Sequence, residues 1–340
     1  MDLELTEEQT WLSESLTTLL QREWTGAETA YAAGPAERDR LWAALVDFGL
    51  FSEELGAIEL CLAARAFGAH LAASPFLGSA ALGFATGVPD DARVSVAWLE
   101  PGGGWSSSGT LTSVRPVDGR KLAVELAAEV DRFAVLGSVD GAPALALVRA
   151  DDRRVTIEPQ PTLDASLPQH AVSFSGADAE SVMDGDVVAR LAAIGALLAA
   201  AESVGAAGRM LDDARAYAAE RRQFGRTIGS NQALRHLLAD MYVRHSSAWS
   251  TVLYAAAAFD DELPDAGHTP AVAKAYVARA AREVAHGALQ VFGGIAFTEE
   301  HQAHRFLRRI IVREQQFGDA IHHERELGRA LAAAIATPVG

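Results

Sequence analysis

The spacing of hydrophobic residues changes twice along this 340-residue chain, and this feature restricts its fold most. Apolar residues recur at helical spacing up to about residue 90 and alternate in short runs between about 91 and 182. Helical spacing returns from about 185. The pattern predicts a mainly α chain with a small β domain. We expect a helical N-terminal domain (1–90), an antiparallel β-sheet middle domain (91–182) and a C-terminal four-helix bundle (185–340).

The two helical segments carry recognisable start and stop signals. Thr6 and Gln9 form a capping-box pattern at the first helix. A second helix stops near Gly49, and a third runs from Ala57 to Leu71, ended by Ser74-Pro75. The C-terminal segment is rich in alanine. Its first predicted helix begins near 185 and ends at Gly225. The second runs from about 231 to 259 and the third from about 270 to 292. The fourth begins near 299 and is interrupted around 318.

The middle segment contains seven short β-rich runs, separated by Gly, Pro and Asp at intervals of roughly ten residues. The glycine- and serine-rich stretch 102–108 is interpreted as a loop. It lacks the G-x-G-x-x-G spacing and the strand-to-helix context of a dinucleotide-binding turn.

Composition excludes several classes of function. The net charge of −16 argues against a nucleic-acid partner, whose affinity would depend on clustered cations. The single Cys61 excludes an internal disulfide framework and a cysteine-based zinc site, and adjacent His322 and His323 cannot share a helix face, so no metal is expected. The most apolar run, 191–201, is too short for a bilayer, and the acidic N-terminus has no secretory signal. We expect a cytoplasmic protein without a membrane partner.

Two segments carry a family resemblance. Residues 220–241, ERRQFGRTIGSNQALRHLLADM, are similar to the R-x-x-F-G-x-x-I-x-x-x-Q motif of acyl-CoA dehydrogenases and the helix that follows it. Residues 290–309, QVFGGIAFTEEHQAHRFLRR, resemble the family's Q-x-x-G-G-x-G-F-x-x-E motif with its trailing arginine. The opening LTEEQ and the strand segment 119–137 are also similar to family counterparts, so the resemblance covers nearly the whole chain.

The resemblance implies FAD bound across a subunit interface. Arg221 would pair with the pyrophosphate of the neighbouring subunit's FAD, and Phe224 would pack against that cofactor. The adenosine side would be lined by Gln232, Gln290, Gly293 and Gly294. Each residue alone also has a structural interpretation, such as an arginine at a helix C-terminus or a glycine that stops a helix. Their combined spacing favours the cofactor.

The family desaturates an acyl-CoA thioester with a carboxylate as general base. Its usual base positions are Phe317 and Gly195 here, and neither side chain accepts a proton. Glu202 is a weak candidate, about two helical turns from Gly195. Asp319 is weaker still because it can cap the helix that follows it.

Other losses affect residues that a subunit uses for its own flavin. The family's P-E-x-x-G-G loop is replaced by LFSEELG (50–56), and its T-E-P-x-x-G-S-D loop by WLEPGGGW (98–105). The family's Thr and Gln that touch the subunit's own flavin fall at Asp319 and Ile321. The residues lent to a neighbour remain.

This selective loss resembles the non-catalytic partner subunits of bacterial α2β2 acyl-CoA dehydrogenases of steroid side-chain degradation, as does the run FGDAIHHER (317–325). The resemblance implies a catalytic paralogue as partner, an acyl-CoA substrate and an electron-transfer flavoprotein as electron acceptor. Two alternatives stay open. One is a self-sufficient homo-oligomeric enzyme with Glu202 as base, and the other is a scaffold of the same fold without flavin.

Overall fold

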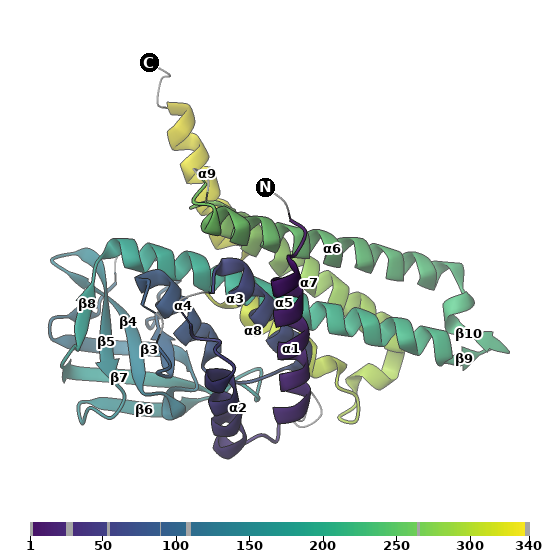
Figure 1. Ribbon diagram of the computed structural model, residues 1–340, viewed down its shortest axis with the longest axis horizontal. Helices are drawn as coiled ribbons and strands as arrows, with labels where there is room; N and C mark the ends of the chain where they lie inside the picture. Colours follow the sequence, from purple (N-terminus) through teal and green to yellow (C-terminus); the bar gives the residue numbers. More distant parts are fainter. Residues whose placement is uncertain are drawn as a thin grey trace. The chain divides into compact units, whose positions relative to one another are not determined.

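The computed structural model describes residues 3–24, 30–52, 55–88, 90–106, 110–263 and 266–336. The chain forms two compact units (Figure 1). We call residues 1–30, 57–72 and 196–340 the helical unit, and residues 31–56 and 73–195 the sheet unit. Each unit draws on several predicted segments, so the division into three domains stays a prediction. Residues 53–54 of the LFSEELG stretch and 107–108 of the predicted loop lie outside the described residues.

The sheet unit contains helices α2 (Pro35–Asp47) and α4 (Phe76–Thr86) and an eight-stranded sheet. Its strand order is β6-β7-β3-β2-β4-β5-β8, and β1 pairs with β4. The strands are β1 (Val94–Ala97), β2 (Ser113–Val114), β3 (Val117–Glu125), β4 (Arg132–Val139), β5 (Ala142–Arg149), β6 (Val155–Gln160), β7 (Gln169–Ala177) and β8 (Ser181–Met183), with a 3-10 turn η1 (Ala127–Glu129). The predicted β region is confirmed.

The sheet is mainly antiparallel, as predicted, with two exceptions. Strands β1 and β2 both pair with β4 in parallel. A parallel neighbour needs a long connection, and the chain between β1 and β4 supplies one because it contains β2 and β3. The core of the sheet is apolar and includes an edge-to-face pair of Phe133 and Phe174, with ring centroids 5.9 Å apart.

Helix α4 was not among the predicted helices because Ser74-Pro75 was interpreted only as a stop. Pro75 is instead the N-cap of α4, a position that tolerates a residue without an N–H. The helix contacts β1 closely. A Cβ on Gly78 would lie 2.3 Å from the Val94 carbonyl oxygen, and the Ser79 hydroxyl accepts from Val94 N at 2.8 Å. A glycine and a small polar residue therefore allow the helix to rest on the strand.

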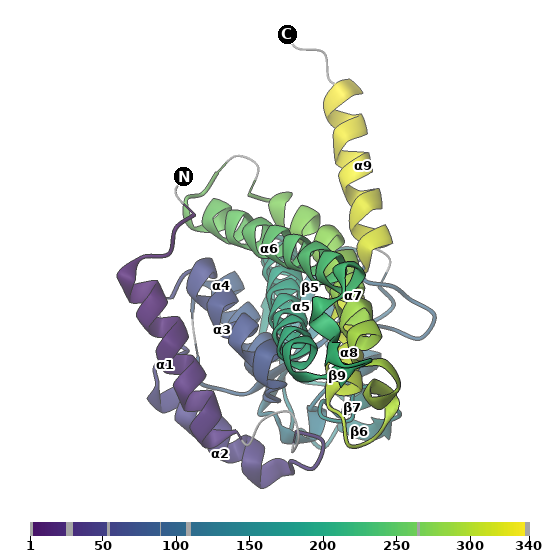
Figure 2. The same cartoon turned by 90° about the vertical axis from the view of Figure 1, so that its right-hand side faces the viewer.

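The helical unit contains α1 and α3 together with the C-terminal helices. The predicted capping box at Thr6 and Gln9 is present at α1. Helices α6 and α7 lie side by side, and α9 extends beyond them (Figures 1 and 2). The helices are α1 (Glu7–Glu23), α3 (Ala57–His70), α5 (Gly185–Glu220, in this unit from Ala196), α6 (Gln232–Asp260), α7 (Thr269–Phe292), α8 (Ala303–Gln315) and α9 (Ala320–Ala336). The interruption predicted around Gly318 separates two helices, α8 and α9.

Helices α3 and α5 cross at two glycines. A Cβ on Gly68 would lie 1.9 Å from the Glu202 carbonyl oxygen, and one on Gly205 would lie 1.9 Å from the Arg65 carbonyl oxygen. Because both positions lack a Cβ, the two backbones approach each other directly. This crossing fixes α5, which carries several of the candidate site residues.

Helix α5 is long and apolar enough, by length and composition, to cross a membrane. The uncharged run 191–201, from which no membrane span was expected, is only part of this longer apolar helix. However, 72% of the most apolar window of α5 is buried inside the structure. The apolar composition is thus explained by a core helix.

Candidate functional site

The R-x-x-F-G segment forms a β-hairpin rather than the end of a helix. Helix α5 ends at Glu220, and two short strands follow, β9 (Arg222–Gln223) and β10 (Arg226–Thr227). The prediction that Gly225 stops the helix is therefore wrong. Phe224 and Gly225 form the turn with φ values of 52° and 82°, and two consecutive left-handed residues are typical of a type I′ hairpin.

The hairpin presents an aromatic ring and a cation to solvent. Phe224 is 100% exposed at the tip. Arg221 lies at the base, where its N–H donates to the Tyr217 carbonyl at 2.8 Å and its carbonyl accepts from Ile228 N at 2.8 Å. Within the described part of the chain, the Arg221 guanidinium forms no ion pair. The fixed backbone and free side chains suit a ligand that is both anionic and aromatic.

The second predicted cofactor segment is the turn at the end of α7. Gly293 has φ 69°, which favours glycine, and it begins the 3-10 turn η3 (Gly293–Phe297). A Cβ on Gly293 or Gly294 would meet nothing within 4 Å. Gln290, in the last turn of α7, and Gln232, in the first turn of α6, are both exposed. The chain therefore leaves backbone and amide groups accessible along this segment.

The structure brings the hairpin and the glycine turn together through aromatic rings. Tyr217, one turn before Arg221, contacts Phe292 edge-on with ring centroids 5.5 Å apart. Phe292 immediately precedes Gly293. Two segments about 70 residues apart in the sequence thus meet in the helical unit.

Glu202 is enclosed and doubly paired. Its two carboxylate oxygens accept from Arg309 Nη1 at 2.6 Å and from Arg313 Nε at 2.8 Å, and all three side chains are buried. Arg309 also donates to the Ala72 carbonyl at 3.0 Å, beyond the end of α3. A general base must lie within reach of the substrate proton, and the Glu202 carboxylate is instead covered by the protein and faces two guanidinium groups. The geometry therefore argues against Glu202 as the base and gives it a structural role.

Phe317, at the position that the family resemblance gives to the usual base, lies at the junction of α8 and α9. Phe317 is buried, with φ 57°, and its carbonyl is 2.9 Å from His323 Nε2. Burial lowers the pKa of His323 to about 4. The Asp319 carboxylate accepts from His322 N at 2.7 Å, so it caps α9 as the sequence suggested. Ile321 is exposed, and Gly195, the alternative base position, is buried in α5. A hydrocarbon ring thus fills the usual position.

A buried lysine closes the same junction. Lys274 Nζ donates to the carbonyls of Arg313 and Glu314, the latter at 3.0 Å, near the C-terminus of α8. Burial lowers the Lys274 pKa to about 7, against the opposing effect of the Glu314 charge. This lysine satisfies carbonyls that a helix end leaves unpaired.

In the sheet unit, the glutamate of the WLEPGGGW segment forms hydrogen bonds within the protein. The Glu100 carboxylate accepts from Lys121 Nζ at 2.8 Å, from the Thr112 hydroxyl at 2.6 Å and from Leu111 N at 2.8 Å. Burial alone would raise the Glu100 pKa, but these hydrogen bonds hold it well below its usual value. Sequence reasoning identified the loop but missed this network, because Glu100 and Lys121 are far apart along the chain.

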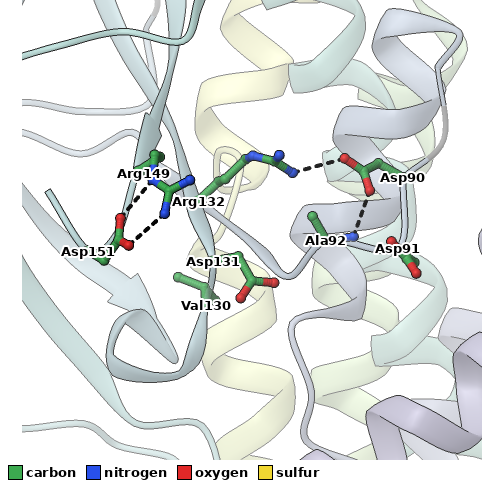
Figure 3. Close-up of a pocket in the computed structure, with 8 residues that line it drawn as sticks. All are labelled: Asp90, Asp91, Ala92, Val130, Asp131, Arg132, Arg149 and Asp151. Carbon is green, nitrogen blue, oxygen red and sulfur yellow. Dashed lines mark hydrogen bonds and ion pairs between the residues drawn. The ribbon is translucent and has the colours of Figure 1, made fainter.

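A surface pocket of about 500 Å³ lies in the sheet unit, at the ends of β4 and β5 (Figure 3). Two ion pairs cross its rim, Arg132 with Asp90 at 2.9 Å and Arg149 with Asp151 at 2.6 Å. Carboxylates outnumber cations among its lining residues, so it does not suit a phosphate-bearing ligand. It contains none of the predicted site residues. The lining is Asp90, Asp91, Ala92, Val130, Asp131, Arg132, Arg149 and Asp151.

Comparison with known proteins gives a consistent result. Residues 185–331 match the family model described as acyl-CoA dehydrogenase, C-terminal domain. Acyl-CoA dehydrogenase IpdE2 of Mycolicibacterium smegmatis is 38% identical over 159 residues, which are 45% of this chain and 46% of that protein. The chain thus spans about half the length of this relative.

Among solved structures, a chain of the ChsE4-ChsE5 complex from Mycobacterium tuberculosis has a TM-score of 0.83 at 25% identity, covering all of both chains. The Tcur3481-Tcur3483 steroid ACAD G363A variant has a TM-score of 0.88 at 22% identity, covering 97% of this chain and 99% of that one. These matches confirm the fold and the family resemblance expected from the sequence.

Proposed function

Residues 185–331 belong to the acyl-CoA dehydrogenase family as its C-terminal domain, and from this premise we propose that the chain lends FAD-binding residues to a catalytic paralogue. The observation that carries the proposal is the hairpin, with Phe224 fully exposed and Arg221 unpaired among the described residues. Leaving a whole phenylalanine ring in water is unfavourable, so a ligand or neighbour that covers it stabilises the assembly.

The residues present fit FAD better as a neighbour's cofactor than as the chain's own. The Arg221 guanidinium would pair with the pyrophosphate, Phe224 would pack against the cofactor, and the Gly293-Gly294 turn would approach the adenosine side together with Gln232 and Gln290. Bound FAD supplies the oxidant for α,β-desaturation of an acyl-CoA thioester. Glu100 and Asp319, in segments that family members use for their own flavin, are engaged in internal hydrogen bonds.

The partner in this proposal is a paralogous acyl-CoA dehydrogenase in an α2β2 assembly, which supplies the catalytic base. Two observations support this proposal. One similar structure is a complex of ChsE4 with ChsE5, and another, Tcur3481-Tcur3483, is described as a steroid ACAD. By analogy we propose a cytoplasmic enzyme that acts on an acyl-CoA, with steroid side-chain thioesters as the first class to test. Electron-transfer flavoprotein would reoxidise the flavin.

The test is the flavin content of the heteromer. The chain is co-purified with a co-expressed acyl-CoA dehydrogenase paralogue, and FAD dissociation is measured by absorbance after dilution. Arg221→Ala removes a charged contact of about 1.5–3 kcal/mol, so FAD should bind roughly ten- to a hundredfold more weakly. Arg215→Ala, which replaces an exposed arginine in the last part of α5, is the matched control. Unchanged FAD affinity in Arg221→Ala would show that the motif is structural.

The same purification separates the alternatives. A self-sufficient homo-oligomer would carry FAD and desaturate a thioester without the paralogue. A scaffold would carry no flavin either alone or with the paralogue. The heteromeric proposal expects flavin and turnover only after the two chains assemble.

A further inference from the structure

Three rings in contact, Tyr217, Phe292 and His301, connect the end of α5, where the hairpin begins, with the glycine turn. We propose that Tyr217 and His301 are positioning residues that hold the two cofactor-binding segments at the separation a dinucleotide requires. This inference rests on the proposed function, because it concerns the same neighbouring FAD. Neither residue was among the site residues predicted from the sequence.

Tyr217 connects the three rings to the base of the hairpin. The Tyr217 carbonyl accepts the Arg221 N–H at 2.8 Å, so the backbone that carries the ring also fixes the base of the hairpin. The ring meets Phe292 at an interplanar angle of 68°, an edge-to-face arrangement favoured by aromatic quadrupoles. A shift of this ring would therefore move the end of α7 relative to Arg221.

His301 contacts the residue that precedes the glycine turn. The His301 ring lies 4.4 Å from the Phe292 ring, centroid to centroid, and its Nδ1 accepts from Ala303 N at 3.2 Å. That hydrogen bond requires an unprotonated Nδ1 and so fixes the ring orientation. Phe292 begins the loop and His301 ends it, so their contact closes residues 293–300 into a defined shape.

A polar contact ties the same loop to α5. Gln302 Nε2 donates to Asp213 Oδ2 at 3.0 Å, and Asp213 Oδ1 accepts from Arg209 Nε at 2.9 Å. Asp213 and Tyr217 are four residues apart on a helix and so share one face. One face of α5 thus holds the loop at two points, while the loop leaves Phe297 exposed.

The experiment measures FAD affinity of the co-purified heteromer for Tyr217→Ala, Tyr217→Phe, His301→Ala and Arg221→Ala. Loss of one aromatic contact should weaken FAD binding roughly three- to tenfold in Tyr217→Ala and in His301→Ala. Tyr217→Phe keeps the ring and should bind FAD as the parent does. If Tyr217 acts through Arg221, the double variant Tyr217→Ala/Arg221→Ala should lose little more affinity than Arg221→Ala alone.

Each other outcome has a definite meaning. If Arg221→Ala loses FAD but Tyr217→Ala and His301→Ala keep parental affinity, the positioning role is wrong and the proposed function stands. If Arg221→Ala also keeps parental affinity, the proposed function fails. If Tyr217→Ala does not assemble, His301→Ala and Gln302→Ala decide, and parental FAD affinity in both overturns the inference.

Discussion

The position of Glu202 in the sequence suggests a catalytic residue, whereas its contacts in the structure are those of a buried ion pair. An acid on an alanine-rich helix near an empty base position suggests catalysis, but two arginines enclose it. A buried carboxylate with charged donors on both oxygens is stable only while all three groups remain, since removing one leaves uncompensated charge. Its role is therefore tested by stability rather than by turnover.

We expect Glu202→Gln to lower the free energy of unfolding by about 3 kcal/mol, because the buried side chains of Arg309 and Arg313 would both lose their ion pair with this carboxylate. Urea unfolding followed by circular dichroism measures this change. Glu220→Gln, on the exposed end of the same helix, should change stability by less than about 0.5 kcal/mol. Equal stability of the two variants would contradict the structural role.

The residues that surround Glu202 could not be found from the sequence. Arg309 and Arg313 are 107 and 111 positions away, and local periodicity says nothing about contacts at that distance. By contrast, Thr6 and Gln9 were predicted as a cap because both partners lie within one turn. Arg221 and Phe224 could be predicted as candidates because they lie within one short motif, whereas the ring contacts of Tyr217 and His301 join segments far apart in the sequence.

At the scale of elements, glycines and end groups determine how the helices meet. The α3–α5 crossing uses Gly68 and Gly205, and Lys274 satisfies carbonyls at the end of α8. The sequence predicted these helices, but not which glycines lie where they cross. The prediction that Gly225 ends a helix was wrong because a glycine with positive φ occurs both after helix ends and in type I′ turns.

Gly205→Ala should destabilise the protein by about 1–3 kcal/mol, because the new Cβ would overlap the Arg65 carbonyl oxygen on α3. Gly328→Ala is the matched control, since a Cβ on this α9 glycine meets nothing within 4 Å. Alanine there should cause no loss and favours the helix by up to about 1 kcal/mol. Thermal unfolding of both variants checks the prediction, which is wrong if Gly205→Ala matches the parent.

Lys274 should make stability depend on pH. Its pKa is about 7 in the folded chain and has its ordinary, higher value when unfolded, so between these values the unfolded state binds more protons. The contribution of Lys274 to the free energy of unfolding therefore rises as pH increases from about 7 towards 10. Below about pH 7 the lysine is charged in both states and contributes no slope.

Lys274→Met should remove this slope. Urea unfolding of the parent and the variant at several pH values from 6 to about 10 gives the difference, in which the other titrating groups cancel. Charged and neutral groups around the lysine (Arg313, Glu314, Asp319 and His323) stay in place in the variant. A parent–variant difference that is constant across this range would contradict the assignment.

For the whole molecule, large apolar side chains are exposed on α9 and at the hairpin tip. Most of α9 lacks cover from the described residues, and Leu331 and Ile335 are 63% and 76% exposed. Helix α9 contacts α7, but most of its residues from 324 to 335 are exposed, so a neighbouring subunit that covers this part would stabilise the assembly. An uncovered helix end of this kind fits the subunit interface that the family resemblance implies. The hairpin tip adds a second uncovered group.

We expect the chain alone to lack desaturase activity. Phe317 and Gly195 occupy the positions where family members carry a carboxylate, and Glu202 is held by two arginines. General-base catalysis contributes typically 10²–10⁴-fold, so the isolated chain should desaturate acyl-CoA thioesters no faster than background. Turnover is measured with an artificial electron acceptor, first with the chain alone and then with the co-expressed paralogue. Substitution of the paralogue's own base by glutamine should abolish turnover of the heteromer. Activity of the isolated chain, or a heteromer that survives that substitution, would show that this chain supplies a base of its own.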